Sequence, residues 1–519
     1  MGQMINIPTS TYNMDDEIGL YITKLAHTDS KLSYWHSMME DKYHISEVFK
    51  YQGICLWDVF SGNIAPNDLF PKANLNIKER KHFIQSILYF VKMGKKVYLI
   101  IKNTIKTNKH MKRYSNPILF VSFERRQIDT FKKTIGEVKR NNANFYVLTT
   151  NTPSHSFPSG YEYISNTVYL EHFQPGILSI YGLLISHAKL SSWLNFVLND
   201  ICSGTEKEKY EIKILINFIK DNLFNVLLLI DTSNHFISKL APKNIISADN
   251  ADLRARVLFL VARKYNIPVY HLTYGFVGFD CFEEKHMIAD KKFVYSSNQK
   301  ELIKNHFLID ENKLVALGCP RFDDLFALRK HKKETNKPIF TILFGSQPHR
   351  KGTYGLITKE LKTEKIEMLF ATISNLKIQT KLLIKPHPDE SREEVEQLEV
   401  LAKKYGIPYE VIHNIDFQKA SAAVDLFVTF FSTLGIEFMI LDIPVCFLYP
   451  VKNIPILNEA CIAKSAYQID NKKDFGNLIE NLLKDDNKIN YEKREAFLKK
   501  EFTNTDGTAS VELAKFLMN

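Results

Sequence analysis

Short apolar runs alternate with amphipathic stretches along much of the chain. The runs at 117–123, 144–149 and 244–249 have strand length and no polar alternation, and stretches with apolar residues at helical spacing occur between them. Uniformly apolar runs fit strands that are buried on both faces of a parallel sheet. The pattern therefore predicts an α/β protein in which helices cover both faces of the sheet.

This first series of predicted strands is interrupted by a helical insert at 175–240, and it continues through 268–272, 292–296 and 313–317. A second series begins directly after residue 338. Its predicted strands are 339–344, 381–385, 409–412, 426–430 and 445–449. The segment between the two series, 331–338, is charged, lacks large apolar residues and ends in Pro, which are features of a linker.

We therefore expect two Rossmann-like domains that face a cleft. The predicted limits are 1–115 for an N-terminal extension, 116–330 for the first domain, 337–450 for the second and 451–519 for C-terminal helices. Ligands of open α/β sheets bind at the carboxyl ends of strands, so functional residues are expected in the loops after them. In the extension, 51–57 is predicted to be a strand or a buried corner, and 81–91 a helix.

Composition indicates an ordinary globular protein. Lys and Arg number 68 against 58 Asp and Glu, a net charge of +10 over 519 residues. This excess is compatible with an anionic nucleotide partner, with peripheral association with an acidic membrane face, or with a generic basic surface. The excess is mild for a chain of this length, and we predict no nucleic-acid partner.

The cysteines and the apolar segments indicate a cytoplasmic location. Six cysteines are scattered without a CxxC pair, so neither a disulfide framework nor a zinc site is expected. The N-terminal residues lead into polar sequence rather than a signal-peptide core. The most apolar long stretch, 424–450, contains Asp425, Glu437 and Asp442, which argues against a transmembrane helix.

One candidate for chemistry is the sequence Lys385-Pro386-His387-Pro388, which directly follows a predicted strand. The prolines fix the backbone on both sides of His387, so the imidazole projects from a rigid loop. There it can donate to a phosphate or to a leaving-group oxygen, and Lys385 adds a positive charge. The alternative is a structural turn with a surface histidine.

A second candidate is the stretch that contains Ser432, Thr433, Gly435 and Glu437. It follows the predicted strand 426–430 and begins a helix. Backbone N–H groups at a helix start can bind an anion, Gly435 allows close approach, and Glu437 can accept two ribose hydroxyls. Helix capping by Ser432 or Thr433 is the alternative function.

The order of these motifs resembles bacterial capsule and surface-polysaccharide glycosyltransferases of the GT-B superfamily. That group is related to teichoic-acid glycerophosphotransferases, polysialyltransferases and capsule Kdo transferases. Residues 318–323 (GCPRFD) are similar to its "G-x-P-R-x-D" segment, and 506–510 (DGTAS) to its closing "DG-x-A-S" helix. The resemblance covers roughly 240–515.

The resemblance implies a metal-independent transferase without a cofactor. It would move a sugar from a CMP-, CDP- or UDP-linked donor to a surface polysaccharide or glycolipid acceptor, with a weak preference for cytidine nucleotides. The second domain would bind the nucleotide, and the first domain, with the extension, would bind the acceptor. Helix dipoles and basic side chains would carry the diphosphate charge. The implied nucleotide-contacting residues are Ser346, Lys385, His387, Ser432, Thr433, Gly435, Glu437 and Arg321.

The sequence departs from these relatives at the expected catalytic base. Their "HG" dipeptide is replaced by Tyr274-Gly275, and the nearest histidine is His271. The catalytic candidates are therefore His387, His271, Asp280, Glu283 and Glu284. The pair Asp249 and Asp252 has D-x-x-D spacing, but Asp249 is expected to cap a helix, and we predict no metal site.

Two other functions fit the same sequence. A sugar-nucleotide 2-epimerase would share the fold, although such enzymes are usually shorter. A non-catalytic scaffold subunit of polysaccharide assembly would explain the missing histidine of the "HG" dipeptide. Nucleotide release from a sugar donor would separate a transferase from both alternatives.

Overall fold

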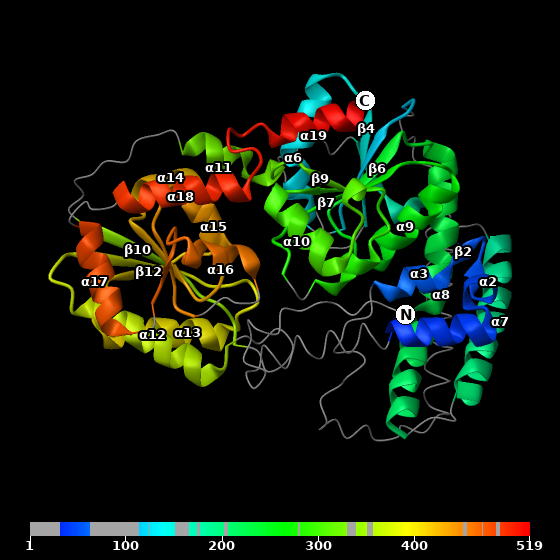
Figure 1. Cartoon of the computed structure of the whole chain (residues 1–519), viewed down its shortest axis with the longest axis horizontal. Coiled ribbons are helices and arrows are strands. Elements are labelled where there is room, and N and C mark those ends of the chain that lie inside the picture. The colour runs from blue at the N-terminus through cyan, green and yellow to red at the C-terminus, as the bar shows by residue number, and fades with distance from the viewer. Residues whose placement is uncertain are drawn as a thin grey trace.

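The structure is a computed structural model, and it contains two separate parallel sheets (Figure 1). It describes residues 32–62, 114–123, 125–150, 166–173, 177–201, 206–278, 281–329, 339–349, 357–449, 454–469, 471–483 and 488–519. The helix expected at 81–91 lies outside these residues.

The first sheet has seven strands among the described residues, in the order β5-β4-β3-β6-β7-β8-β9. They are β3 (Ile118–Val121), β4 (Phe145–Thr149), β5 (Thr167–Tyr169), β6 (Asn244–Ser247), β7 (Val269–Leu272), β8 (Lys291–Val294) and β9 (Leu314–Ala316). All their pairings are parallel. Every residue of β3, β4 and β6 is buried, because helices cover both faces of the sheet.

The helices of the first domain form two layers. Apolar side chains of α6 (Arg125–Arg140) and of the C-terminal α19 (Ala509–Met518) pack on one face of the sheet. Those of α8 (Glu206–Leu240) and α9 (Leu253–Lys264) pack on the other. The shorter elements are η4 (Leu170–Phe173), η5 (Phe282–His286), α10 (Ser297–Phe307), η6 (Glu311–Lys313), η7 (Pro320–Phe322) and α11 (Asp323–Leu328).

The second sheet has six parallel strands among the described residues, in the order β12-β11-β10-β13-β14-β15. They are β10 (Phe340–Gly345), β11 (Thr380–Lys385), β12 (Tyr409–Val411), β13 (Leu426–Thr429), β14 (Val445–Phe447) and β15 (Tyr467–Gln468). The last strand lies beyond residue 450, so the sheet extends further along the chain than the strand pattern predicts.

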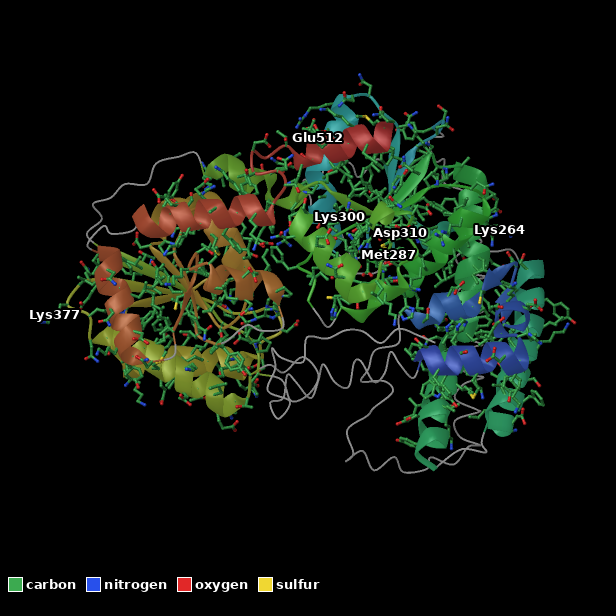
Figure 2. The ribbon with its side chains drawn as sticks, viewed as in Figure 1. Lys264, Met287, Lys300, Asp310, Lys377 and Glu512 are labelled. Carbon is green, nitrogen blue, oxygen red and sulfur yellow. The ribbon has the colours of Figure 1, made fainter. Side chains whose placement is uncertain are left out.

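Helices also sandwich the second sheet. On one face lie α12 (Lys359–Ser374), α13 (Arg392–Lys404) and α17 (Lys472–Leu483). On the other lie α14 (Phe417–Ala423), α15 (Leu434–Ile440), α16 (Pro455–Ile462) and α18 (Lys488–Glu501). Lys377, in the turn before β11, marks the end of this domain farthest from the first (Figure 2).

The helical insert carries the described N-terminal residues. It consists of α7 (Ile177–Ile201) and α8, and against it pack a helix at 32–43, α2 (Ile45–Val48), β1 (Lys50–Tyr51), β2 (Ile54–Cys55) and α3 (Leu56–Ser61). The rings of Phe49 and Trp193 stack with centroids 5.5 Å apart. The patch at 51–57 is therefore a short hairpin that leads into α3, and its apolar side chains cover the insert.

The chain crosses back to the first domain at its C-terminal end (Figure 1). The buried carboxylate of Asp323 accepts hydrogen bonds from the backbone N–H groups of Ala509 and Ser510, at 3.2 and 2.8 Å, and so holds the start of α19. Gly507 has a φ of +84°, and a Cβ there would lie 2.8 Å from the carbonyl oxygen of Asp323. The "G-x-P-R-x-D" and "DG-x-A-S" segments thus contact each other.

Two Rossmann-like domains joined in this way make up the GT-B fold, with a helical insert and C-terminal helices. This confirms the fold predicted from the sequence. Among the described residues, no helix combines the length and apolar character that crossing a membrane requires.

Candidate functional site

The second sheet has a topological switch point at β10. Strands β11 and β12 lie on one side of it and β13 to β15 on the other, so the connecting helices diverge there. Such a point leaves a crevice at the carboxyl ends of the strands, where ligands of open α/β sheets bind. Gly345 pairs with both Lys385 and Thr429, so the loops after β10, β11 and β13 leave the sheet at the same level.

The loop after β11 presents His387 at this edge. Its backbone N–H donates to the carboxylate of Glu390 at 2.6 Å, and its Nδ1 accepts from the backbone N–H of Asp389 at 3.2 Å. The side chain is 37% exposed. The ammonium group of Lys385 donates to the carbonyl of Pro386 at 2.8 Å, and burial lowers the pKa of Lys385. His387 is thus accessible, whereas Lys385 is directed to its own loop.

Ser346, in the loop after β10, is buried, and its hydroxyl supports the loop after β11. Its Oγ donates to Glu390 at 2.6 Å, and Lys362 of α12 donates to the same carboxylate oxygen at 2.7 Å. The side chain of Glu390 is fully buried, so its contacts with Ser346 and Lys362 fix the position of the His387 backbone.

The loop after β13 brings Ser432 and Thr433 to the same edge. Ser432 Oγ accepts from the backbone N–H of Leu434 at 3.3 Å, while the side chain of Thr433, at the N-cap position of α15, makes no capping hydrogen bond. The backbone N–H of Phe431 donates to the side chain of Gln347 at 2.9 Å and so joins this loop to the one after β10.

Gly435 has a packing role in the structure. A Cβ at this buried position would lie 2.9 Å from Phe447 and 3.1 Å from Val445, both on β14. The glycine therefore lets α15 approach the sheet closely.

Glu437 and Arg321 form an ion pair that joins the two domains. Arg321 follows β9 of the first sheet and Glu437 lies in α15 of the second, and their side chains are 28% and 13% exposed. Arg321 also donates to the carbonyl of Tyr274 at 3.4 Å. Burial raises the pKa of Glu437, and the charge of Arg321 opposes the rise. The carboxylate of Glu437 is thus paired with Arg321, whereas we expected it to be available for ribose hydroxyls.

The base candidates of the first domain are mostly enclosed. His271 on β7 is buried, with its Nδ1 3.1 Å from Lys292 Nζ and a further hydrogen bond to the backbone of Ala248. Lys292 also donates to Glu284 at 2.6 Å. Burial lowers the pKa of His271 well below its usual value, so the imidazole is neutral. The structure does not bring His271 or Glu284 to the domain surface.

Glu283 lies in η5, where its backbone carbonyl accepts from Asn250 at 3.0 Å. Asp280 lies outside the described residues. Asp280 and Glu283 therefore stay predictions for the catalytic base.

Helix α9 is capped by Asp252, which corrects the expectation that Asp249 is its cap. Asp249 Oδ1 instead accepts from the backbone N–H groups of Ala251 and Asp252, both at 2.8 Å, one turn earlier. Asp252 also pairs with Arg254. Both carboxylates are therefore occupied by local contacts. The described residues contain no group of three or more His, Cys, Asp or Glu arranged for a metal ion.

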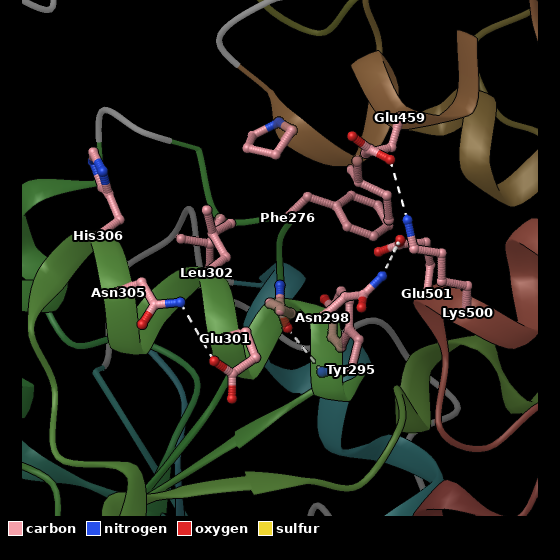
Figure 3. A pocket seen from close by; sticks show the side chains of 14 residues that line it. Phe276, Tyr295, Asn298, Glu301, Leu302, Asn305, His306, Glu459, Lys500 and Glu501 are labelled. Atoms are coloured by element: carbon pink, nitrogen blue, oxygen red, sulfur yellow. Dashed lines mark hydrogen bonds and ion pairs between the residues drawn. The ribbon is translucent and has the colours of Figure 1, made fainter. Parts of the chain in front are cut away.

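A pocket of about 470 Å³ lies between the two domains (Figure 3). Helix α10 forms one wall, and α16 and α18 form the opposite wall. Among its lining residues, Asn298 donates to Glu501 at 2.8 Å and Lys500 to Glu459 at 3.2 Å, and Phe276 supplies an apolar surface. None of the described residues that the sequence singled out lines this pocket. The described lining residues come from four segments that are far apart in the sequence, and no local motif connects them.

Comparisons with known proteins give one partial family match and several distant structural similarities. The family model described as CDP-Glycerol:Poly(glycerophosphate) glycerophosphotransferase matches residues 277–519, slightly less than half of the chain. No curated protein matches.

Among solved structures, Staphylococcus aureus MnaA with UDP is 15% identical, covers 77% of this chain and 95% of its own, and has a TM-score of 0.46. UDP-GlcNAc 2-epimerase from Neisseria meningitidis bound to UDP-GlcNAc is 13% identical, with coverages of 78% and 99% and a TM-score of 0.48. Acinetobacter baumannii MurG is also 13% identical, with the same coverages and a TM-score of 0.43. This protein is distantly similar to these chains, and the similarity assigns it no activity.

Proposed function

We propose that the protein is a glycosyltransferase that binds a nucleotide-activated sugar at the carboxyl edge of the second sheet. The observation that carries this proposal is the position of two loops beside the switch point. The loop with His387 follows β11 and the loop with Ser432 and Thr433 follows β13, on either side of β10. A diphosphate in the crevice between them would meet an imidazole, two hydroxyls and the backbone N–H groups at the start of α15.

His387 would stabilise the leaving phosphate. When the bond between the sugar and the phosphate breaks, negative charge grows on the phosphate oxygen, and a donor held in place beside it lowers the barrier. The buried Glu390 holds the backbone of His387, so the imidazole needs little reorganisation. Ser432 and Thr433 would bind the phosphates in both the ground state and the transition state. CMP, CDP and UDP are the nucleotides we propose, with metal-independent chemistry.

The acceptor would enter from the first domain through the pocket between α10 and α18. Among its described lining residues, three glutamates, Glu301, Glu459 and Glu501, accompany one lysine, Lys500. Such a lining disfavours a phosphate and suits the hydroxyl groups of a polysaccharide or glycolipid, with Phe276 under a sugar ring. A glycolipid acceptor would place the protein at the inner face of the cytoplasmic membrane.

Glycerophosphate transfer is the second candidate, and the family match over 277–519 favours it. In that reaction an acceptor hydroxyl attacks the phosphorus of CDP-glycerol, and CMP leaves. Tyr274 stands where those relatives have the histidine thought to be the base, so this chain would need another base.

Incubation of the purified protein with CMP-, CDP- and UDP-sugars and with CDP-glycerol, with and without acceptor, tests both candidates. Release of nucleotide from a sugar donor supports glycosyl transfer, and release of CMP from CDP-glycerol alone supports the second candidate. Epimerisation of a UDP-sugar without acceptor identifies an epimerase. Absence of binding to every nucleotide would leave only a scaffold function and would overturn the proposal.

A further inference from the structure

A second imidazole, that of His349, is held at the switch point by a buried carboxylate. His349 follows β10 by four residues, and its backbone N–H and its Nδ1 both meet Glu394 Oε1, at 3.1 and 2.7 Å. The side chain is 32% exposed, whereas that of Glu394 is 10% exposed. Because Nδ1 is turned inward to the carboxylate, the edge of the ring that carries Nε2 is turned away from it.

We propose that His349 binds the phosphate of the donor through Nε2, beside His387, with Glu394 as the residue that positions it. The inference rests on the proposed function, because it assumes that a nucleotide occupies the carboxyl edge of the second sheet.

The carboxylate of Glu394 is built to stay ionised. The backbone N–H groups of Ser391 and His349 and the ammonium of Lys362 all donate to it. Burial opposes ionisation, but these donors prevail and lower the pKa of Glu394 to about 2. An ionised carboxylate accepts the proton of Nδ1, which fixes the tautomer and leaves Nε2 to a ligand.

The two imidazoles share one support. Lys362 donates to Glu390 at 2.7 Å and to Glu394 at 2.9 Å, and it is 7% exposed. Glu390 holds the backbone of His387, and Glu394 holds His349. Their loops leave the paired neighbours β10 and β11. The cluster of Lys362, Glu390 and Glu394 therefore sets the spacing between the two histidines.

A phosphate would draw a proton from solvent onto Nε2 and convert His349 to an imidazolium. The positive ring would then lie between two anions, Glu394 and the phosphate, and each would accept one of its N–H groups. Among the described residues, the charged groups in contact with the ring or with its partner are Glu394 of α13 and, beyond it, Lys362 of α12, which also pairs with Glu390. No covalent bond forms at His349, so the ring is a binding group that gains strength as the leaving phosphate gains charge.

The alternative is that His349 only fastens its loop to α13. Two substitutions distinguish these functions, because the Asn amide mimics Nδ1 and the Gln amide reaches the position of Nε2. His349→Asn keeps the bond to Glu394 and removes the ligand contact, whereas His349→Gln keeps a donor for the ligand. His413→Ala, on the exposed loop after the edge strand β12, is a matched control for loss of a surface imidazole.

The test is calorimetric titration of the full chain with CDP, CMP and UDP, in two buffers of different ionisation enthalpy. We expect His349→Asn to weaken the affinity for CDP about tenfold or more, as loss of a charged hydrogen bond does, and to lower the proton uptake on binding. His349→Gln should recover part of the affinity, and His413→Ala should bind as the wild type does.

Wild-type affinity and proton uptake in a folded His349→Asn protein would overturn the inference and leave the proposed function intact. Failure of the wild type to bind any of the three nucleotides would overturn both. Thermal denaturation of each variant identifies losses that come from unfolding.

Discussion

The interdomain ion pair between Arg321 and Glu437 provides the sharpest test of how this cleft is built. Replacing Glu437 by Gln keeps the shape of the side chain and removes its charge. A hydrogen bond to a charged group contributes about 1.5–3 kcal/mol, and Gln can still accept a weaker bond from Arg321. We therefore expect a loss of about 2 kcal/mol, since the pair is mostly buried. For a domain of about 150–250 residues, a loss of about 2 kcal/mol corresponds to a fall in Tm of roughly 4–8 °C.

The assay is thermal denaturation with and without CDP, together with calorimetric affinity. Arg321→Gln is the matched partner variant, and it should lower Tm by a similar amount. The double variant places two amides opposite each other and should lose less than the sum of the single losses, because the two residues are in direct contact. The affinity for CDP should change little in any of these proteins.

The opposite result would refute this reasoning. If Glu437→Gln melts like the wild type but binds CDP at least tenfold more weakly, then Glu437 contacts the nucleotide. The motif-based interpretation, in which this carboxylate accepts ribose hydroxyls, would then be correct, and the ion pair with Arg321 would open when ligand binds.

Three further predictions concern the edge of the second sheet. His387→Ala should lower turnover about 10²–10³-fold without changing Tm, because the ring contacts its own loop. His387→Asn should recover part of the lost turnover. Steady-state kinetics measures both effects, and wild-type turnover in His387→Ala would exclude His387 from catalysis. Ser432→Ala with Thr433→Ala should weaken nucleotide affinity at least about tenfold in a titration, whereas unchanged affinity with a lower Tm would identify capping residues. The pKa of Glu394 falls from 4.5 to about 2 on folding, so its stabilisation is present above pH 4.5 and lost as pH falls toward 2. The free energy of unfolding should therefore fall more steeply with decreasing pH in the wild type than in Glu394→Gln. Equal slopes would contradict a contribution of Glu394 to stability.

The strands were predictable because their signal is local. The run at 426–430 contains β13, whose four residues are all buried. Side chains buried on both faces of a parallel sheet must all be apolar, so a short window of sequence carries the information. Strand β15 has only two residues, one of them exposed, and its sequence gives no such signal.

The partners of the charged residues were not predictable in this way. The sequence indicates that Glu437 lies early in a helix after a strand, and the structure agrees. It does not indicate that Arg321, 116 residues earlier, reaches the same carboxylate. That contact depends on how two domains dock, which is a property of their packed surfaces and not of either local pattern.

The environment of His349 was not predictable for a related reason. On its own it is one histidine in a polar loop. Its partner gave a weak signal, since Ser391 and Glu394 have the S-x-x-E spacing of a capping box, and the structure contains that box. The unusual feature of the site is the buried ammonium group of Lys362 in α12. It bridges the carboxylates of Glu390, in the loop after β11, and Glu394, in α13. A single sequence cannot show that three segments converge.

Burial and ion pairing leave few candidates for the base that would activate the acceptor. His271 is neutral and buried, and it is hydrogen-bonded to Lys292 and to the backbone of Ala248, so it does not replace the "HG" histidine whose position Tyr274 occupies. Glu284 is anchored to Lys292 at 2.6 Å, which fixes one end of the segment that begins at the pocket residue Phe276. Within that segment Asp280 and Glu283 are the carboxylates that remain as candidates for the base. Under the proposed function, a base there would act on an acceptor bound by the first domain, while the imidazoles of the second domain would stabilise the leaving phosphate. Asp280→Asn and Glu283→Gln should then differ: the variant that removes the base should lose turnover while nucleotide affinity stays unchanged, and retention of turnover by both would exclude this segment as the source of the base.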